Sequence, residues 1–373
     1  RRNKVFSGSA LYVQTVHIFI KNAFVLCQAF SDRFCYNGKR VLYTQRAKRE
    51  RWKGRKKNGK KEKESRKEGK RKNRERNEKE EKGGKSKTGK MKRAKKRRTE
   101  KITEAVKNMC ISANCNLNDD VYSALKEAEK TEPSPVGREM LSQLIKNAGI
   151  AKTDCVPICQ DTGLAVVFVT MGQDVHITGG SLEGAINEGV RQGYTEGYLR
   201  KSVVKDPFIR VNTNDNTPAI IHYSIVEGDG FKIEIAPKGA GSENMSKIFM
   251  MKPADGIEGA KKAIIDAVEA AGPNPCPPMI IGVGCGGNFE TAALLAKKAL
   301  LRPVGSHSEL PHIKEMEIEL LDKINRTGIG PQGLGGRTTA LALNIETFAT
   351  HIACMPIAVN ISCHVTRHAV CEL

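Results

Sequence analysis

The stretch PMIIGVGCGGNFETAALLAKKALL, residues 278–301, shows the character of the fold. Its first part, residues 278–283, is uncharged and rich in β-branched side chains, which predicts a buried strand. Glycines then flank Cys285 on both sides, and residues 289–301 have the apolar spacing of a helix. A buried strand that turns through glycine into a helix indicates a protein in which both element types pack together.

The rest of residues 101–373 also mixes helices and strands, without a repeat. Helical spacing begins near Lys101, and Ser181 precedes a further helix. Short apolar or alternating runs predict strands at 164–170 and 174–178. The other helices are expected at 121–130, 135–149, 257–271 and 310–324. We therefore predict the α/β class, or mixed α+β, with mixed sheets covered by helices.

One β-hairpin is expected in the middle of this region. Residues 222–226 and 231–236 both alternate between apolar and polar side chains. The four residues between them, 227–230, contain two glycines, which suits a tight turn. The pattern therefore predicts that the two strands pair with each other.

Charge divides the chain near residue 100. Residues 1–100 hold 36 of the 62 Lys and Arg residues and 10 of the 41 Asp and Glu residues. Residues 101–373 are therefore net acidic by five charges, although the whole chain carries +21. The sequence predicts a disordered, strongly basic extension at 1–100 and one folded domain at 101–373.

The basic extension has two interpretations. Residues 46–98 are almost entirely Lys, Arg, Glu, Asn and Gly, with no apolar periodicity. Such a run can bind RNA, DNA or an acidic membrane surface by neutralising phosphates, with release of counterions. It can also be a solvated extension without a partner, and this interpretation is favoured because long runs of like charge are usually solvated.

The sequence contains no segment as apolar as a membrane-spanning helix. Residues 5–30 come nearest, but polar side chains interrupt them, and a span takes ~20 apolar residues. The cysteines after residue 100 look unpaired, which favours a reducing compartment, and we expect a cytoplasmic protein. These cysteines are Cys110, Cys115, Cys155, Cys159, Cys276, Cys285, Cys354, Cys363 and Cys371.

Three of these cysteines stand among residues suited to a metal site. Cys159 lies in PICQDTG (157–163), Cys285 in GVGCGGN (282–288) and Cys363 in VNISCH (359–364). Glycine beside a cysteine lets backbone amides approach its sulfur. Each one alone could be a buried cysteine in a tight turn. Together they suggest three thiolate ligands, with one metal position left open to substrate.

Other residues compete with this interpretation. Cys155 and Cys354 lack flanking glycines and polar partners, so we assign both to packing. Asp161 could hold a turn, Arg200 could be a surface residue at a helix end, and His351 could be a core histidine bonded to the backbone.

The segment GIGPQGLGGRTT, residues 328–339, contains the letters of a dinucleotide-binding motif. It follows a charged helical stretch and contains Pro331, whereas a nucleotide loop follows a strand and opens a helix. We therefore exclude NAD binding. The segment is either an ordered loop that brings backbone amides and a cation to a compact site, or a purely structural loop.

Six segments taken together closely resemble the class I iron–sulfur hydro-lyases. This family includes the oxygen-sensitive fumarate hydratases and the L(+)-tartrate dehydratases. The resemblance extends in order over residues 101–373 and does not include residues 1–100. The segments are PICQDTG (157–163), GYLRKS (197–202), KGAGSEN (238–244), GVGCGGNFE (282–290), GIGPQGLGGRTT (328–339) and NISCHVTRHA (360–369).

The resemblance implies a [4Fe–4S] cluster held by Cys159, Cys285 and Cys363, whose fourth iron binds substrate. It implies Asp161 and His351 as catalytic residues. Single-chain members continue into a further domain, whereas this chain ends ten residues after Cys363. We therefore expect the alpha subunit of a heteromeric enzyme, with a separate beta subunit and further dimerisation. The substrate pocket implied by the resemblance consists of Gln160, Asp161, Arg200, Gly241 and His351.

The activity expected from the resemblance is the reversible hydration of fumarate to malate, a step of the tricarboxylic acid cycle, with the cluster as Lewis acid. Dehydration of L(+)-tartrate remains an alternative, because the motifs do not resolve one extra hydroxyl contact. An alternative of another class is a basic-tailed nucleic-acid-binding protein with a structural metal site. The net acidic charge of residues 101–373 argues against that alternative.

Overall fold

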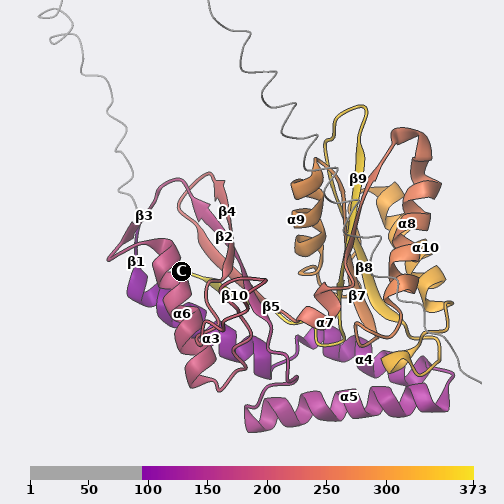
Figure 1. Cartoon of the computed structure of the whole chain (residues 1–373), viewed down its shortest axis with the longest axis horizontal. Helices are drawn as coiled ribbons and strands as arrows, with labels where there is room; N and C mark the ends of the chain where they lie inside the picture. The colour runs from indigo at the N-terminus through magenta and orange to yellow at the C-terminus, as the bar shows by residue number, and fades with distance from the viewer. Residues whose placement is uncertain (1–94) are drawn as a thin grey trace, which may run out of the picture. The chain divides into compact units, whose positions relative to one another are not determined.

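The structure is a computed structural model that describes residues 95–373 (Figure 1). The predictions for residues 1–94 therefore lie outside the described residues. The described structure includes residues before the expected boundary at residue 101, where β1 (Lys95–Arg98) pairs in parallel with β3 (Val175–Thr178). Four basic residues in a row carry no apolar pattern, so the sequence offered no sign of this strand.

The first large sheet has the strand order β10-β5-β2-β4. Strand β2 is parallel to β4 and antiparallel to β5, so the sheet is mixed. Helices α3 and α6 cover one face, where Val106 and Ile186 pack against Val167 and Ile233 (Figure 1). The bounds are α3 (Thr99–Cys115), β2 (Leu164–Gly172), α6 (Leu182–Glu196), β4 (Ile220–Val226), β5 (Phe231–Lys238) and β10 (Ala369–Glu372).

The predicted hairpin is wrong, although both of its strands exist. Strand β2 lies between β4 and β5, so the two strands flank β2 and do not pair with each other. The connecting turn crosses the end of β2, where Gly172 donates to the carbonyl of Gly230 at 2.7 Å. A side chain on Gly172 would lie 2.2 Å from the carbonyl oxygen of Gly228, which explains the glycine there. Local alternation could not reveal a strand inserted from 50 residues upstream.

The second large sheet has the strand order β6-β9-β7-β8. Strand β7 is parallel to β8 and antiparallel to β9, so this sheet is mixed as well, as the sequence predicted. Helices α8 and α10 pack on one face and α9 on the other (Figure 1). The bounds are β6 (Lys247–Met251), α8 (Gly256–Ala271), β7 (Met279–Gly286), α9 (Phe289–Ala299), α10 (Pro311–Asn325), β8 (Ala340–Phe348) and β9 (Met355–Ser362).

Strand β7 presents different side chains to its two faces. Met279, Ile281 and Val283 join the apolar cluster under α8 and α10. Gly282 and Gly284 face α9, and a Cβ on Gly284 would lie 2.0 Å from the carbonyl oxygen of Ala292. These glycines therefore let α9 pack directly on the strand.

Helices α4 (Asp119–Thr131) and α5 (Pro135–Asp154) form a third cluster with the second sheet. Leu125 and Leu141 are fully buried there beside Ile280. Helix α5 runs five residues beyond its predicted end and stops at Cys155, whose φ of 53° is left-handed. Between Lys95 and Leu373, no helix combines the length and apolarity that crossing a membrane requires.

The close contact between β7 and α9 predicts the effect of adding one methyl group. Gly284→Ala should lower the free energy of unfolding by about 2 kcal/mol or more, because α9 must move away from the strand. Urea denaturation measures this change. The control is Gly149→Ala in α5, where no heavy atom lies within 4 Å. That change should raise stability by about 0.5–1 kcal/mol, and equal effects of the two would contradict the packing argument.

Candidate cysteine site

Cys159 lies in the loop that connects α5 to β2. The loop is fixed next to the cysteine, because the Ile158 N–H donates to the Asn114 carbonyl at 2.9 Å. The Asn147 side-chain amide donates to the Ile158 carbonyl at 2.8 Å. Cys159 is half-buried and packs against the same apolar cluster as Cys363. The two cysteines therefore share one region of the fold.

Asp161 connects the Cys159 loop to two other segments. One carboxylate oxygen accepts from the Gly163 N–H at 3.0 Å, and the other accepts from the Ala240 N–H at 2.8 Å. The Asp161 backbone carbonyl accepts from Arg367 Nη2 at 2.6 Å. The loop is thus held against the segment that contains Gly241 and against the segment after Cys363.

Two buried cations lie near Cys363, which directly follows β9. Burial raises the pKa of this thiol, while Arg367 and Lys238 lower it and Cys159 raises it further. Arg367 is 4% exposed, and its Nε has no hydrogen-bond partner in the described structure. Lys238 is 7% exposed, and burial lowers its pKa to about 8 against the opposing charge of Glu243. Positive charge beside a thiol favours the thiolate, which is the form that binds metals.

Lys238 belongs to an ionic group at the junction of β5 and α7 (Ala240–Glu243), in which Lys238 is buried and Glu243 is 42% exposed. Its Nζ lies 3.2 Å from a Glu243 carboxylate oxygen and donates to Ser242 Oγ at 2.8 Å. Glu243 also pairs with Lys297 of α9 and accepts from the Asn360 side chain of β9 at 3.0 Å. Burial raises the pKa of Glu243, but the two lysines outweigh it and hold the pKa at about 2. One carboxylate therefore ties α7 to α9 and β9.

Cys276 lies beside this pair of cysteines, a position that the sequence analysis left without a role. Burial raises its pKa, and the neighbouring Cys159 thiol raises it further. The backbone N–H of His364 lies 3.4 Å from the Cys276 carbonyl, next to Cys363 in sequence. The φ of Cys276 is 55°, a conformation that costs a non-glycine residue about 1–3 kcal/mol. Prolines on both sides, in PNPCPP, were the available signal of an unusual backbone here.

Cys285 lies away from Cys159 and Cys363 in the structure, and the ligand set that the resemblance implies stays a prediction. In the β7–β9 pair, Ile280 is opposite Ser362 and Cys285 is opposite Ile357. Cys285 and Cys363 therefore lie at opposite ends of the sheet, roughly 20 Å apart at the rise of a strand. Burial raises the pKa of Cys285 to about 12. Its flanking glycines accommodate α9 and β8.

His351 lies at the same far end of the sheet as Cys285. It is exposed in the loop between β8 and β9, so it is not the core histidine that one interpretation described. The neighbouring Thr350 hydroxyl donates to the Gly287 carbonyl at 2.9 Å, two residues after Cys285. Within one chain, the structure does not bring His351 to Cys159 and Cys363.

The other predicted pocket residues lie around the cysteines. The Thr162 hydroxyl donates to the Arg200 carbonyl at 2.9 Å, which places Arg200 beside the Cys159 loop. The side chains of Arg200 and Gln160 are both exposed. The missing Cβ of Gly241 would lie 4.0 Å from the Asn274 carbonyl oxygen, close to Cys276.

The donor set at this place fits an iron–sulfur cluster. Within residues 95–373, no three His, Cys, Asp or Glu side chains converge as ligands for a single metal ion. In an iron–sulfur cluster each thiolate binds its own iron, so the sulfurs surround the group and do not converge on one atom. Cys159, Cys276 and Cys363 come from three separate segments, Cys159 is near each of the other two, and two buried cations lie beside Cys363.

The glycine-rich segment 328–339 contacts this site at one end and leaves it at the other. Gln332, in the 3₁₀ turn η3 (Pro331–Gly333), bonds the Pro277 carbonyl next to Cys276. Arg337, the expected cation, is exposed, and its guanidinium lies 3.4 Å from Asp322. Its backbone N–H and that of Thr338 donate to the buried Glu132 carboxylate at 2.9 and 2.7 Å. The loop thus brings no cation to the cysteines.

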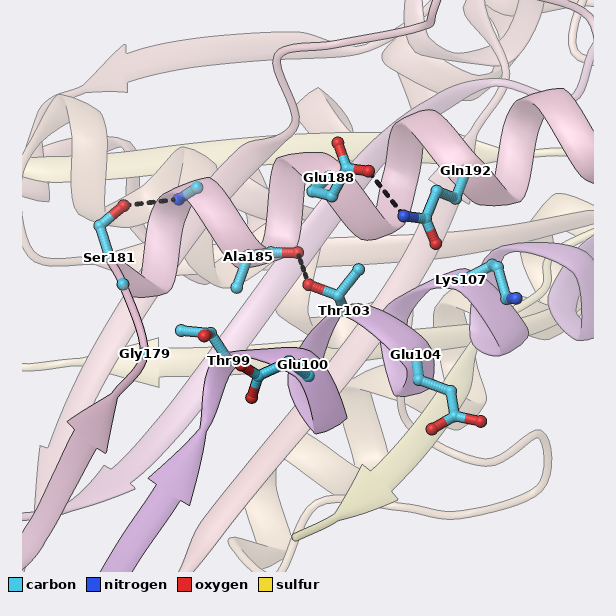
Figure 2. Close-up of a pocket in the computed structure, with 12 residues that line it drawn as sticks. Thr99, Glu100, Thr103, Glu104, Lys107, Gly179, Ser181, Ala185, Glu188 and Gln192 are labelled. Atoms are coloured by element: carbon cyan, nitrogen blue, oxygen red, sulfur yellow. Dashed lines mark hydrogen bonds between the residues drawn. The ribbon is translucent and has the colours of Figure 1, made fainter.

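A groove of about 570 Å³ lies elsewhere, between the start of α3 and α6 (Figure 2). Three carboxylates line it, from Glu100, Glu104 and Glu188. Its polar side chains largely bond within the two helices and across them, for example Thr103 to the Ala185 carbonyl at 3.0 Å. No cysteine is among the residues that line it, so the groove is separate from the cysteine site.

Comparisons with known proteins agree with the motifs. The family model described as fumarate hydratase (Fumerase) matches residues 103–372. A Methanocaldococcus jannaschii protein provisionally named L(+)-tartrate dehydratase subunit alpha is 41% identical over 276 residues, 72% of this chain and 96% of that protein. L(+)-tartrate dehydratase subunit alpha of Escherichia coli K12 is 33% identical over 271 residues, 72% of this chain and 89% of that protein.

The Glu132 carboxylate predicts a pH-dependent contribution to stability. Burial raises its pKa, but N–H donation from Arg337, Thr338 and Ser134 outweighs burial and lowers the pKa. Glu132→Gln should therefore cost about 2–3 kcal/mol at pH 7. A lowered pKa means that this contribution is present above the ordinary value of 4.5 and is lost as the pH falls through the folded value.

Urea denaturation of both proteins between pH 7 and pH 3 tests this. The difference in free energy of unfolding between wild type and Glu132→Gln should become smaller as the pH falls. Glu139→Gln, at an exposed position of the next helix, should show no gap at any pH. A gap for Glu132→Gln that widens toward acid would contradict the assigned bonds.

Proposed function

Since the chain belongs to the fumarate hydratase family, as an alpha-type subunit of the iron–sulfur hydro-lyases, we propose that it is the cluster-bearing subunit of an L(+)-tartrate dehydratase. The observation that carries this proposal is that the Cys159 thiol is near enough to Cys276 and to Cys363 to raise the pKa of each, with Arg367 and Lys238 beside Cys363. The choice of tartrate rests on the names of the relatives. Fumarate hydration, the activity expected from the sequence, is the second candidate, and the description of the family model favours it.

Three thiolates from this chain would hold a [4Fe–4S] cluster. When bound, such a cluster supplies a Lewis acid at an iron that no side chain of this chain ligates. Arg367 and Lys238 offset part of the negative charge of the thiolates, which makes three adjacent anionic sulfurs compatible with a partly buried site. Asp161 holds the Cys159 loop and the Arg367 segment in register through its two carboxylate bonds and its carbonyl.

Arg200 and Gln160 would bind the substrate. Both side chains are exposed and start from segments that are bonded to each other beside Cys159. A guanidinium binds a carboxylate through two parallel N–H bonds, and an amide can donate to a hydroxyl. A dicarboxylate with hydroxyl groups on its two middle carbons therefore matches the donors at this edge. Gly241, which has no side chain, leaves the backbone open to the substrate.

A second subunit would complete the site. Cys276, Gln160 and Arg200 are exposed in this chain, so the site opens outward. Both oxygens of Asp161 already accept backbone N–H groups, and His351 lies at the other end of the sheet. We therefore assign proton transfer to a group of a beta-type subunit, which the names of the relatives imply. His351 stays a prediction. The free cysteines remain the basis for proposing a cytoplasmic location.

The ligand assignment predicts which cysteines the cluster needs. Cys159→Ser, Cys276→Ser and Cys363→Ser should each abolish the visible absorbance of the cluster after anaerobic reconstitution, because each removes one thiolate. Cys285→Ser should keep the absorbance, as should Cys155→Ser. Iron and sulfide bound per chain, measured for each variant, should follow the same pattern. Loss of the cluster in Cys285→Ser, with retention in Cys276→Ser, would restore the ligand set expected from the sequence.

The substrate assignment predicts a specific defect in Arg200→Lys. With the beta-type subunit co-expressed, KM should rise about tenfold for the preferred dicarboxylate, because an ammonium cannot form the paired bonds. The visible cluster absorbance should not change. Arg138→Lys, an exposed position in α5, serves as control.

The same assay decides between the two candidate activities. A kcat/KM for L(+)-tartrate well above that for fumarate or malate supports the proposal. The reverse ratio would make the chain a fumarate hydratase subunit, and no turnover of either would count against both.

A further inference from the structure

Cys276 has a backbone conformation that its own residue type does not favour. Its φ of 55° is in the left-handed region, where a side chain meets the backbone. Cys276 is also exposed and lies outside the strands and helices, immediately before β7. We therefore expect residues outside the segment 275–278 to hold the Cys276 backbone in this conformation.

Gln332, in the glycine-rich loop 328–339, donates hydrogen bonds to this segment. Its backbone N–H donates to the Pro277 carbonyl at 2.9 Å, and its side-chain Nε2 donates to the same oxygen at 2.6 Å. Gln332 has a left-handed φ of 54° itself, which aims both donors from one residue at one acceptor. The next residue is Gly333, and a Cβ there would lie 2.2 Å from Cβ of Pro273. The loop and the segment before β7 are therefore in direct contact.

His364 also contacts this segment, through the Cys276 carbonyl. Its ring Nδ1 lies 3.0 Å from the Cys276 carbonyl oxygen, which can only accept, so the ring carries a proton on Nδ1. Its backbone N–H lies 3.4 Å from the same oxygen. His364 directly follows Cys363, so these bonds join the segments of two cysteines. Gln332 Nε2 lies 3.3 Å from the ring, which brings the two residues together over residues 276–277.

We propose that Gln332 and His364 are positioning residues that hold Cys276 toward Cys159 and Cys363, and that the glycine-rich loop 328–339 serves to support this third cysteine. This inference rests on the proposed function for its ligand set. It gives a role to a motif that resembles a nucleotide loop in letters only. Residues that orient metal ligands typically change metal affinity 10–100-fold when they are replaced.

The test uses the full chain with two replacements of Gln332. Gln332→Met keeps the size without a donor, and Gln332→Glu places an acceptor against the Pro277 carbonyl. After anaerobic reconstitution, the rate of cluster loss to a ferrous chelator should rise about tenfold in both. Glu132→Gln is the control, since it loosens the other end of the same loop without contacting Cys276. If the loop is merely structural, the replacements at Gln332 and at Glu132 should raise the rate of cluster loss by the same factor.

A second measurement needs no iron. Phenylarsine oxide bridges two neighbouring thiols, so its affinity for the apo chain reports how well the cysteines face one another. Affinity should fall about tenfold in both Gln332 variants and in His364→Leu. It should recover in His364→Asn, whose side-chain amide places a donor near the position of Nδ1. Mass spectrometry of digested adducts identifies Cys276 as one of the bridged residues.

The outcomes separate this inference from the proposed function. A wild-type chain that takes up no cluster would remove the proposed function, while arsenical binding would still decide whether Gln332 and His364 position Cys276. Gln332 variants that match wild type in both measurements overturn the inference. So does an effect of equal size in Glu132→Gln. If one Gln332 variant fails to fold, the other variant and the two His364 variants decide.

Discussion

The antiparallel register of β7 and β9 determines which residues can act together in this protein. Ile280 is opposite Ser362, so the start of β7 and the end of β9 meet at one edge of the sheet. Cys276 and Cys363 lie at that edge. The loop containing Cys159, which leads into β2 of the first sheet, comes close to both. Cys285 and His351 are carried to the opposite edge by the same register. A shift of this pairing would disperse the site.

Ion pairs around Glu243 hold the parts of the site that the β7–β9 register does not fix. The Glu243 carboxylate pairs with Lys238 at the end of β5 and with Lys297 of α9, and it accepts from Asn360 of β9. The Glu243 side chain is 42% exposed, so solvent screens these pairs, and removing one partner should cost less than breaking a fully buried pair. The group therefore holds together elements of both sheets. It also keeps a lysine close to Cys363, where it favours the thiolate.

Sequence patterns predicted the fold class and most elements, because strands such as β2 and helices such as α9 carry strong apolar periodicity. They failed where distant segments decide the outcome. The inserted β2 separated the expected hairpin, and only the β7–β9 register reveals that Cys285 is far from Cys363. Glycines beside Cys285 looked like access for a metal, yet they make room for α9. Cys276 drew no prediction from the sequence, because prolines and not glycines flank it.

The central claim is that one cluster is held by Cys159, Cys276 and Cys363. Alkylation footprinting of the full chain, with and without the reconstituted cluster and read by mass spectrometry at each cysteine, tests it most directly. We predict that the cluster protects these three cysteines together, whereas the exposed Cys155 is labelled equally in both states. The rate at the half-buried Cys285 should also be the same in both. Protection of Cys285 together with free labelling of Cys276 would contradict the account.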